Sequence, residues 1–285
     1  MGILESWEVW VLIYLASSII FAQSFRVSKR QMKNVGQMTV LLELFTAFFA
    51  LFFLPFFKFI FPTDLTIYGT LFLVTIIYAV TDRLNIEARY GLEPSTFSML
   101  KQLSTVFMII FGLLFFKEEF VFNKIIGAIL IVFANLLLAF EKGKFQLNKY
   151  FLISVISNLL FAIAMMINVN ISDSFNLAFY TILTVSLPAL FISIFGRYSF
   201  QSLQEEFRTY DKKYFLLSSF TWCLMLLSSV RAYQLGSVIV IAPLFALTSI
   251  LNAVVEYFIN PNGNKFLKKM VAAIIIIIGV LLVKA

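Results

Sequence analysis

The sequence has no histidine and one cysteine, and only 13% of its residues are charged. Without histidine, a Ser-His-Asp triad and the common histidine metal sites cannot form, and neither a G-x-S-x-G nor a P-loop pattern appears. The single Cys223 cannot form a disulfide or a paired thiolate metal site within one chain. We therefore expect no enzyme, no cofactor, no metal site and no ATP-driven pump.

Apolar residues take the place of the missing polar ones. Of the 285 residues, 61% are hydrophobic and 35 are phenylalanine, with a mean hydropathy of +0.95. A soluble core of this size could not bury so many apolar side chains, whereas a lipid bilayer accepts them on every outward face. We expect a multi-pass protein of the cytoplasmic membrane of a bacterium. The net charge of +7 does not indicate nucleic-acid binding, because the basic residues lie between apolar runs.

Apolar runs of about 20 residues predict ten membrane spans. Because ten is even, both chain ends are expected on the same side of the membrane. The longest connection, residues 196–213, is charged and too short for a soluble domain. The expected spans are residues 8–25, 36–60, 67–84, 94–116, 121–140, 149–170, 175–196, 213–234, 237–259 and 266–284.

The two halves of the chain resemble each other. "YGLEPSTFSMLKQL" followed by "NKIIGAILIVFANLLL" is similar to "LGSVIVIAPLFALT" followed by "KKMVAAIIIIIGVLLV", roughly 145 residues later. With five spans, an odd number, in each half, the second half enters the membrane inverted. The predicted fold is an all-α membrane protein of ten transmembrane helices. They form two inverted five-helix repeats, residues 1–145 and 146–285, around a central cavity.

A known family shares this layout. The ten spans, the glycine-containing breaks before the fourth and ninth spans and the stretch "FFKEEFVFNKIIGAILI" resemble the EamA-like members of the drug/metabolite transporter superfamily. In that family's pattern the closing glutamate corresponds to Glu118 or Glu119, and "NPNGNK" occupies the equivalent place in the second half. The resemblance implies a cavity lined by spans one to four and six to nine, with spans five and ten outside. It implies no particular substrate.

Two ionisable residues lie well inside predicted spans. A charged side chain at membrane depth costs about 2.5–3.5 kcal/mol on insertion scales, so it needs a partner or a hydrated cavity. Lys101 and Glu43 each lie seven residues beyond a span start, so both should be about 10 Å deep. Polar and small residues share their helix faces, and we expect Lys101 to pair with Glu43 when no substrate is bound. The candidate substrate-binding residues are Lys101, Glu43, Gln102, Ser98, Thr105, Thr46, Asn158 and Ser249.

The pair has two interpretations. In the first, it only locks two helices together, although buried ion pairs often contribute little net stability. If it serves function, Lys101 holds a substrate carboxylate or phosphate, or Glu43 takes up a proton or organic cation that displaces Lys101. Residues nearer the span ends, Arg231 and Glu256, are typical of interfacial anchors, as are the aromatic residues near the start of span one, Trp7, Trp10 and Tyr14.

These features predict a secondary transporter that moves a small organic solute, such as an amino acid or related metabolite, by alternating access. A proton or cation would be its coupling ion, and the lipid bilayer its other partner. The alternative class is a non-transporting membrane scaffold or a subunit of a lipid-carrier flippase. A scaffold should have an interior without polar residues between its halves, so a solute-accessible cavity would discriminate between the two.

The orientation of the chain has two opposing indications. Sixteen of the 22 Lys and Arg residues fall in the connections after odd-numbered spans. The positive-inside rule then places both chain ends outside the cytoplasm. The family resemblance implies the opposite, with both ends in the cytoplasm.

Overall fold

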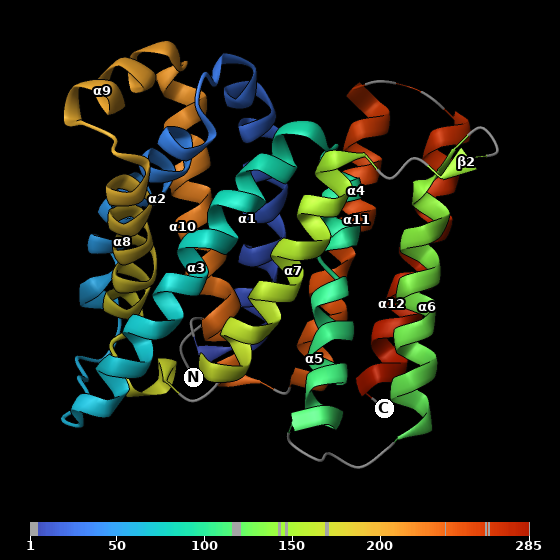
Figure 1. The fold of residues 1–285 in the computed structure, drawn as a ribbon. Helices are drawn as coiled ribbons and strands as arrows, with labels where there is room; N and C mark the ends of the chain where they lie inside the picture. Colours follow the sequence, from blue (N-terminus) through green and yellow to red (C-terminus); the bar gives the residue numbers. More distant parts are fainter. Residues whose placement is uncertain are drawn as a thin grey trace.

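The computed structural model describes residues 5–115, 121–141, 144–145, 148–168, 171–236, 238–259, 261 and 263–284. Almost all of these residues are helical, and the long helices lie side by side between two ends of the molecule (Figure 1). The helices are α1 (Trp7–Ser28), α2 (Val35–Leu51), α3 (Leu65–Gly91), α4 (Pro94–Leu100), α5 (Leu103–Phe115), α6 (Phe122–Ala139), α7 (Lys149–Asn168), α8 (Leu177–Gly196), α9 (Phe200–Thr209), α10 (Lys212–Leu235), α11 (Val238–Ile259) and α12 (Gly263–Lys284).

The remaining regular elements are short. Three 3₁₀ turns, Lys29–Gln31, Leu54–Phe56 and Ser172–Ser174, lie in the connections between helices. Strands β1 (Phe140–Glu141) and β2 (Lys144–Phe145) pair antiparallel, with Phe140 opposite Phe145.

The described helices are those of a multi-pass membrane protein. Five are long and apolar enough to cross a bilayer, and four shorter helices are also apolar. Apolar side chains cover much of their outer surface, as lipid contact requires. The five long stretches are Trp7–Gln31, Leu65–Gly91, Leu177–Gly196, Lys212–Leu235 and Lys265–Val283.

Side-chain caps in the sequence mark where several helices begin. Asn34 accepts a hydrogen bond from the Gln37 amide before α2, at 3.1 Å, and Asp64 accepts one from the Thr66 amide before α3, at 2.8 Å. Asn176, Ser199 and Asp211 cap α8, α9 and α10 in the same way. Such caps satisfy amides that have no partner within the helix, so the connecting loops fix where the helices start.

Helices that are distant in the sequence pack against each other in pairs. Five such pairs join α1 to α10, α2 to α8, α3 to α7, α4 to α11 and α6 to α12. Figure 1 shows α6 and α12 together at one edge of the molecule, with α4, α5, α7 and α11 beside them. The helices of the first half therefore find their main partners in the second half.

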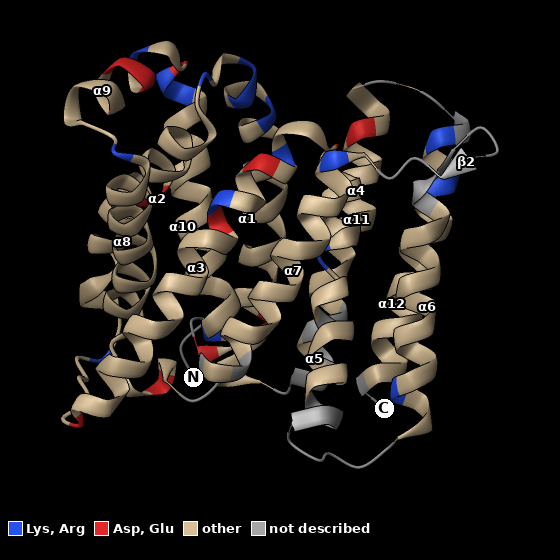
Figure 2. Cartoon of the chain, in the orientation of Figure 1, with Lys and Arg blue, Asp and Glu red and all other residues tan. Residues whose placement is uncertain are grey.

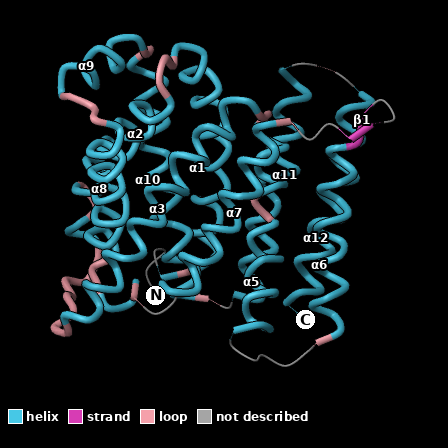
Figure 3. The backbone as a smooth tube through the Cα atoms, viewed as in Figure 1, coloured by secondary structure: helices cyan, strands magenta, loops and turns pink. Residues whose placement is uncertain are grey.

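The structure differs from the predicted spans at four places. The predicted second span, residues 36–60, is wrong at its end, because α2 stops at Leu51 and the 3₁₀ turn Leu54–Phe56 and an irregular segment follow. Pro55 in that turn has no backbone N–H with which to continue the helix. Helix α3 continues to Gly91, beyond the expected end at residue 84, because charged residues are accommodated inside it. The fourth span is interrupted after Leu100, and a short loop divides it into α4 and α5 (Figure 3). The charged connection of residues 196–213 contains α9, whose Leu203 and Phe207 pack on the core.

Charged residues are concentrated at one end of the molecule. Figure 2 shows the blue Lys and Arg residues gathered mainly at the end of the molecule that carries α9 and β2, whereas α1 begins and α12 ends at the opposite end. The start of α1 and the end of α12 are thus on the side with fewer basic residues. Which side faces the cytoplasm stays a prediction, with the charge pattern favouring the basic end.

Two glycines bring α6 and α12 into backbone contact. A Cβ atom at Gly127 would lie 2.4 Å from the carbonyl oxygen of Gly279, and one at Gly279 would lie 2.8 Å from that of Gly127. Small residues allow close helix approach of this kind in membranes, where packing replaces hydrophobic association. The edge pair of helices therefore depends on both positions.

We expect Gly127→Val to lower the stability of the purified protein by about 1–3 kcal/mol, because the added side chain meets backbone that cannot move aside. Gly69→Ala is the control, since no atom lies within 4 Å of a Cβ at that position of α3. The control should be unchanged or slightly stabilised, as alanine favours helix. Thermal unfolding in detergent measures both. Equal melting temperatures for the two variants would contradict the close contact.

Candidate functional site

A small cavity lies among α1, α3, α10, α11 and the interruption between α4 and α5. Its volume of about 20 Å³ is enough for about one water molecule. Among the described residues, no group of three His, Cys, Asp or Glu side chains converges to hold a metal ion. Its lining is largely polar: Tyr14, Ser18, Arg89, Ser98, Lys101, Gln102 and Thr248, with Ala22, Phe97 and Met225.

The interruption of the fourth span places Lys101 at this cavity. Here the helical hydrogen bonds tighten, with the Gln102 amide bonded to the Met99 carbonyl and the Ser104 amide to the Lys101 carbonyl. Ser104 Oγ also donates to the Lys101 carbonyl, at 2.8 Å. Non-helical backbone at membrane depth is tolerated only where other groups satisfy it.

Asn158 of α7 supplies the missing partner. Its Nδ2 donates to the Leu100 carbonyl at 3.1 Å and to the Ser154 carbonyl at 2.7 Å. The Leu100 carbonyl, at the end of α4, therefore has a donor although the regular helix stops there. Asn158, predicted as a substrate-binding residue, has a positioning role in this conformation.

The predicted contact between Lys101 and Glu43 is not made. Glu43 is completely buried, and neither of its carboxyl oxygens has a hydrogen-bond partner. Lys101 instead lies near the ring of Phe161, with its Nζ 5.7 Å from the ring centroid. The charged groups close enough to act on Lys101 are Asp82 and Arg89, both on α3. The reason is helix placement, because α2 packs mainly against α8 and not against α4.

Arg89 is the second cation at the cavity. Its guanidinium carbon lies 3.9 Å from the ring centroid of Phe97 and 4.8 Å from that of Phe21. Aromatic faces stabilise a guanidinium without neutralising its charge. Within the described residues, neither Arg89 nor Lys101 forms an ion pair through its side chain.

The two acids lie beside these cations. Asp82 interacts electrostatically with Lys101 and Arg89, and its carboxyl group is also close to Glu43 and to Asn85. Asn85 accepts a hydrogen bond from Ser157 Oγ of α7, at 2.7 Å. Spacing along α3 brings Asp82, Asn85 and Arg89 to one face, since they are three and four residues apart.

The other predicted site residues separate into three groups. Ser98 and Gln102 line the cavity, and Ser98 Oγ accepts from Asn252 Nδ2 at 3.1 Å. The hydroxyl of Ser249 is buried without a hydrogen-bond partner, and Thr46 donates to the Ser219 carbonyl of α10 at 3.2 Å. The side chain of Thr105 lies outside the described residues, as do Glu118 and Glu119.

Sequence reasoning missed three residues of the site. Arg89 lies beyond the predicted end of span three at residue 84, and Asp82 lies in the last turn of that span, although their helical spacing with Asn85 is a signal of one polar face. Tyr14 was expected in an interfacial belt. It is buried, lines the cavity and stacks on Phe245 with ring centroids 3.9 Å apart.

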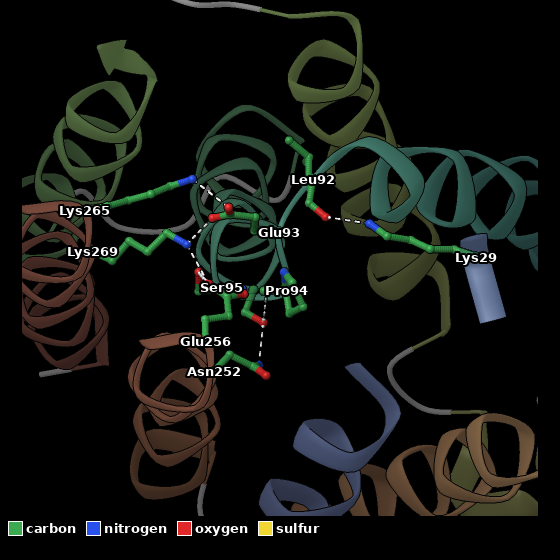
Figure 4. Close-up of polar contacts among 10 residues, drawn as sticks. Lys29, Leu92, Glu93, Pro94, Ser95, Asn252, Glu256, Lys265 and Lys269 are labelled. Atoms are coloured by element: carbon green, nitrogen blue, oxygen red, sulfur yellow. Dashed lines mark hydrogen bonds and ion pairs between the residues drawn. The ribbon is translucent and has the colours of Figure 1, made fainter. Parts of the chain in front are cut away.

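A second polar cluster holds the beginning of α4, as Figure 4 shows. Glu256 of α11 accepts from the Ser95 amide at 2.8 Å, from Ser95 Oγ at 2.6 Å and from Lys269 Nζ of α12 at 2.5 Å. The interpretation of Glu256 as an interfacial anchor is therefore wrong, because its side chain is buried among three donors. Arg231, the other expected anchor, contacts Gln234 at 3.3 Å.

Glu93 extends this cluster toward solvent. Lys265 donates to it at 2.6 Å and Lys269 also contacts it, so Lys269 bridges two carboxylates. Partial burial raises the pKa of Glu93, but the hydrogen bonds from Lys265 and Lys269 outweigh burial and hold the pKa below its usual range. Beside the cluster, Lys29 donates to the Leu92 carbonyl at 3.1 Å (Figure 4).

We expect Lys269→Met to destabilise the protein by about 3–5 kcal/mol, because Glu256 would remain as a buried charge without its cation. Lys265→Met is the matched control. The Lys265 side chain is 47% exposed, so its loss should cost no more than about 1 kcal/mol.

The stability of the protein should also depend on pH through Glu93, because its pKa is lowered in the folded protein. Its ion pairs stabilise the folded protein at pH values above the usual glutamate pKa, and this stabilisation is lost as the pH falls through the pKa of Glu93 in the folded protein. Thermal unfolding at neutral and acidic pH measures these effects, and similar losses in both variants would contradict the burial argument.

Comparisons with known proteins identify the scaffold on which these clusters lie. No curated protein matches the chain. A solved structure described only as "Crystal structure of protein" is 11% identical, with a TM-score of 0.59 and coverage of 97% of this chain and 96% of that one. At this identity the likeness shows a shared fold alone. Residues 8–140, which span α1 to α6 except for Trp7, match the model of the EamA-like transporter family. In this part the chain is similar to the EamA-like transporter family, which is part of the drug/metabolite transporter superfamily.

Proposed function

We propose that this protein is a secondary transporter that moves a small organic solute, such as an amino acid or related metabolite, by alternating access. The observation that carries the proposal is the pair of cations, Arg89 and Lys101, at a cavity inside the helix bundle. Charges at membrane depth are costly, and they are typically retained for substrate or ion binding. The similarity of residues 8–140 to a transporter family agrees with this function.

The helix pairing supports the proposed architecture of ten spans in two inverted repeats. With α4 and α5 as the fourth span, the first half contains spans one to five and the second half spans six to ten. The observed pairs then join span one to eight, two to seven, three to six, four to nine and five to ten. A two-fold axis between residues 1–145 and 146–285 would produce this pattern, with a site between the halves.

The charges favour a solute with an acidic group. Arg89 offers a planar, multiply donating guanidinium and Lys101 a compact ammonium, and both suit a carboxylate or phosphate. Ser98, Gln102 and Thr248 would add hydrogen bonds to other solute groups from α4, the interruption and α11. Ser249, Thr46 and Thr105 stay candidate substrate-binding residues in other conformations. The second mechanism, in which a cation bound by Glu43 displaces Lys101, would need Glu43 to reach the cavity.

The size of the cavity implies a conformational change. Space for about one water molecule does not admit an organic solute, so the described conformation corresponds to a closed state. Movement of one half relative to the other would open the site to each side in turn.

The alternative function, a membrane scaffold or a lipid-carrier flippase subunit, predicts no solute binding. A cavity of this size is compatible with a scaffold, whereas two interior cations with one nearby acid, Asp82, are costly without a ligand. A binding experiment therefore separates the two functions.

A thermal-stability screen of the purified protein against amino acids and organic acids should return at least one stabilising ligand. A ligand at 100 times its dissociation constant stabilises by about 2.7 kcal/mol. Lys101→Met should lose this stabilisation, because the cation that holds the acidic group is gone. Lys58→Met, an exposed lysine in the connection before α3, is the charge-matched control and should keep it. If no compound stabilises the protein, or if the Lys101 variant is stabilised as much as the wild type, the proposed site is wrong. Uptake into proteoliposomes then tests whether the bound ligand is transported.

A further inference from the structure

The further inference deepens the proposed function, on which it rests, and concerns the acids behind the two cations. Glu43 is fully buried, and no donor from the described residues reaches either oxygen of its carboxyl group. Its close ionisable neighbour is another acid, Asp82 of α3. A carboxylate in this position would be charged, buried, unsatisfied and next to a like charge.

Among the described residues, the helices packed against α2 place no compensating cation at Glu43. α2 packs against α3, α8, α9 and α10. Helix α3 contributes Asp82 and Arg89, and the interruption of span four contributes Lys101, but both cations act on Asp82 and not on Glu43. Residues 177–196 of α8 contain no charged side chain. The charged groups of the other two helices lie near helix ends: Glu205, Glu206 and Arg208 of α9, and Lys212, Lys213 and Arg231 of α10.

A single proton resolves this arrangement. Two carboxylates that share a buried site do not both ionise, because each disfavours the charged form of the other. A proton on one of them supplies the O–H donor that Glu43 lacks, and the pair then carries one negative charge beside Lys101 and Arg89. Proton exchange would occur through Asp82, which is partly accessible, whereas Glu43 is not.

We infer that Glu43 and Asp82 form a carboxyl–carboxylate pair that binds one exchangeable proton and serves as the coupling site of the transporter. The pair passes from two negative charges to one when it takes a proton from water, and it returns the proton to water when it opens to the other side. No further reactant is required.

The cations connect this proton to the solute. An anionic group bound by Lys101 and Arg89 would offset the positive charge that acts on Asp82, so the acid pair would hold its proton more tightly. Coupling between two ligands is reciprocal, and protonation of the pair must then favour binding of the anion. Solute anion and proton would therefore bind together.

Infrared spectroscopy of the purified protein tests the proton site directly, with the proton itself as the ligand. At neutral pH, the wild-type protein should show the carbonyl band of a protonated carboxyl group, and Glu43→Gln should lose that band. Glu256→Gln is the matched control and should keep the band, because Glu256 is also buried but, unlike Glu43, accepts hydrogen bonds from Lys269 and Ser95. In Asp82→Asn the band should disappear at a lower pH than in the wild type, because the neighbouring negative charge is removed.

Several results would overturn the inference: no band in the wild type at neutral pH, a band that persists in Glu43→Gln, or an unchanged titration in Asp82→Asn. If Glu43→Gln does not fold, as judged by circular dichroism, the titrations of the wild type and Asp82→Asn decide. If the band is missing, the proton site is wrong but the proposed solute transport is not contradicted. If the band is clear but the ligand screen finds no ligand, solute transport is contradicted and the proton site is not.

Discussion

The cost of placing charge away from water is the constraint on which the interior of this protein depends. Two cations, Arg89 and Lys101, and two acids, Asp82 and Glu43, come together from α2, α3 and the interruption of span four. Different surroundings reduce the desolvation cost of each charge. Arg89 lies between two aromatic rings, and Lys101 is partly accessible at a water-sized cavity. Glu43 has only another acid beside it, which is why a shared proton follows from its position.

The short helix α4 connects this interior to the charged end of the molecule. Its first turn is held by Glu256 and, through the shared Lys269, by Glu93, so that α11 and α12 fix where it begins (Figure 4). Its last carbonyl is held by Asn158 of α7. The helix that carries Ser98 and leads to Lys101 is therefore attached to the second half of the chain at both ends. Relative movement of the halves would act on the site through these attachments.

The sequence predicted the membrane class and the approximate helices, because hydropathy and span length determine these properties. It did not predict which helices are neighbours. Glu43 and Lys101 were expected at one depth and on polar faces, but periodicity cannot tell that α2 packs against α8 while α3 presents its charges to Lys101. Arg89 was assigned to a loop because it lies beyond the predicted end of span three at residue 84. Its acceptance inside α3 depends on the rings of Phe21 and Phe97, from two other helices.

The central claim is that the cations and the acids act as one coupled site. Isothermal titration of a carboxylate ligand returned by the screen, repeated across pH in the wild type and in Asp82→Asn, measures this coupling. Binding should tighten as pH falls in the wild type, over a range where the ligand itself does not titrate, and this dependence should be lost or shifted in the variant. An affinity that does not change with pH, or an identical dependence in both proteins, would contradict the account.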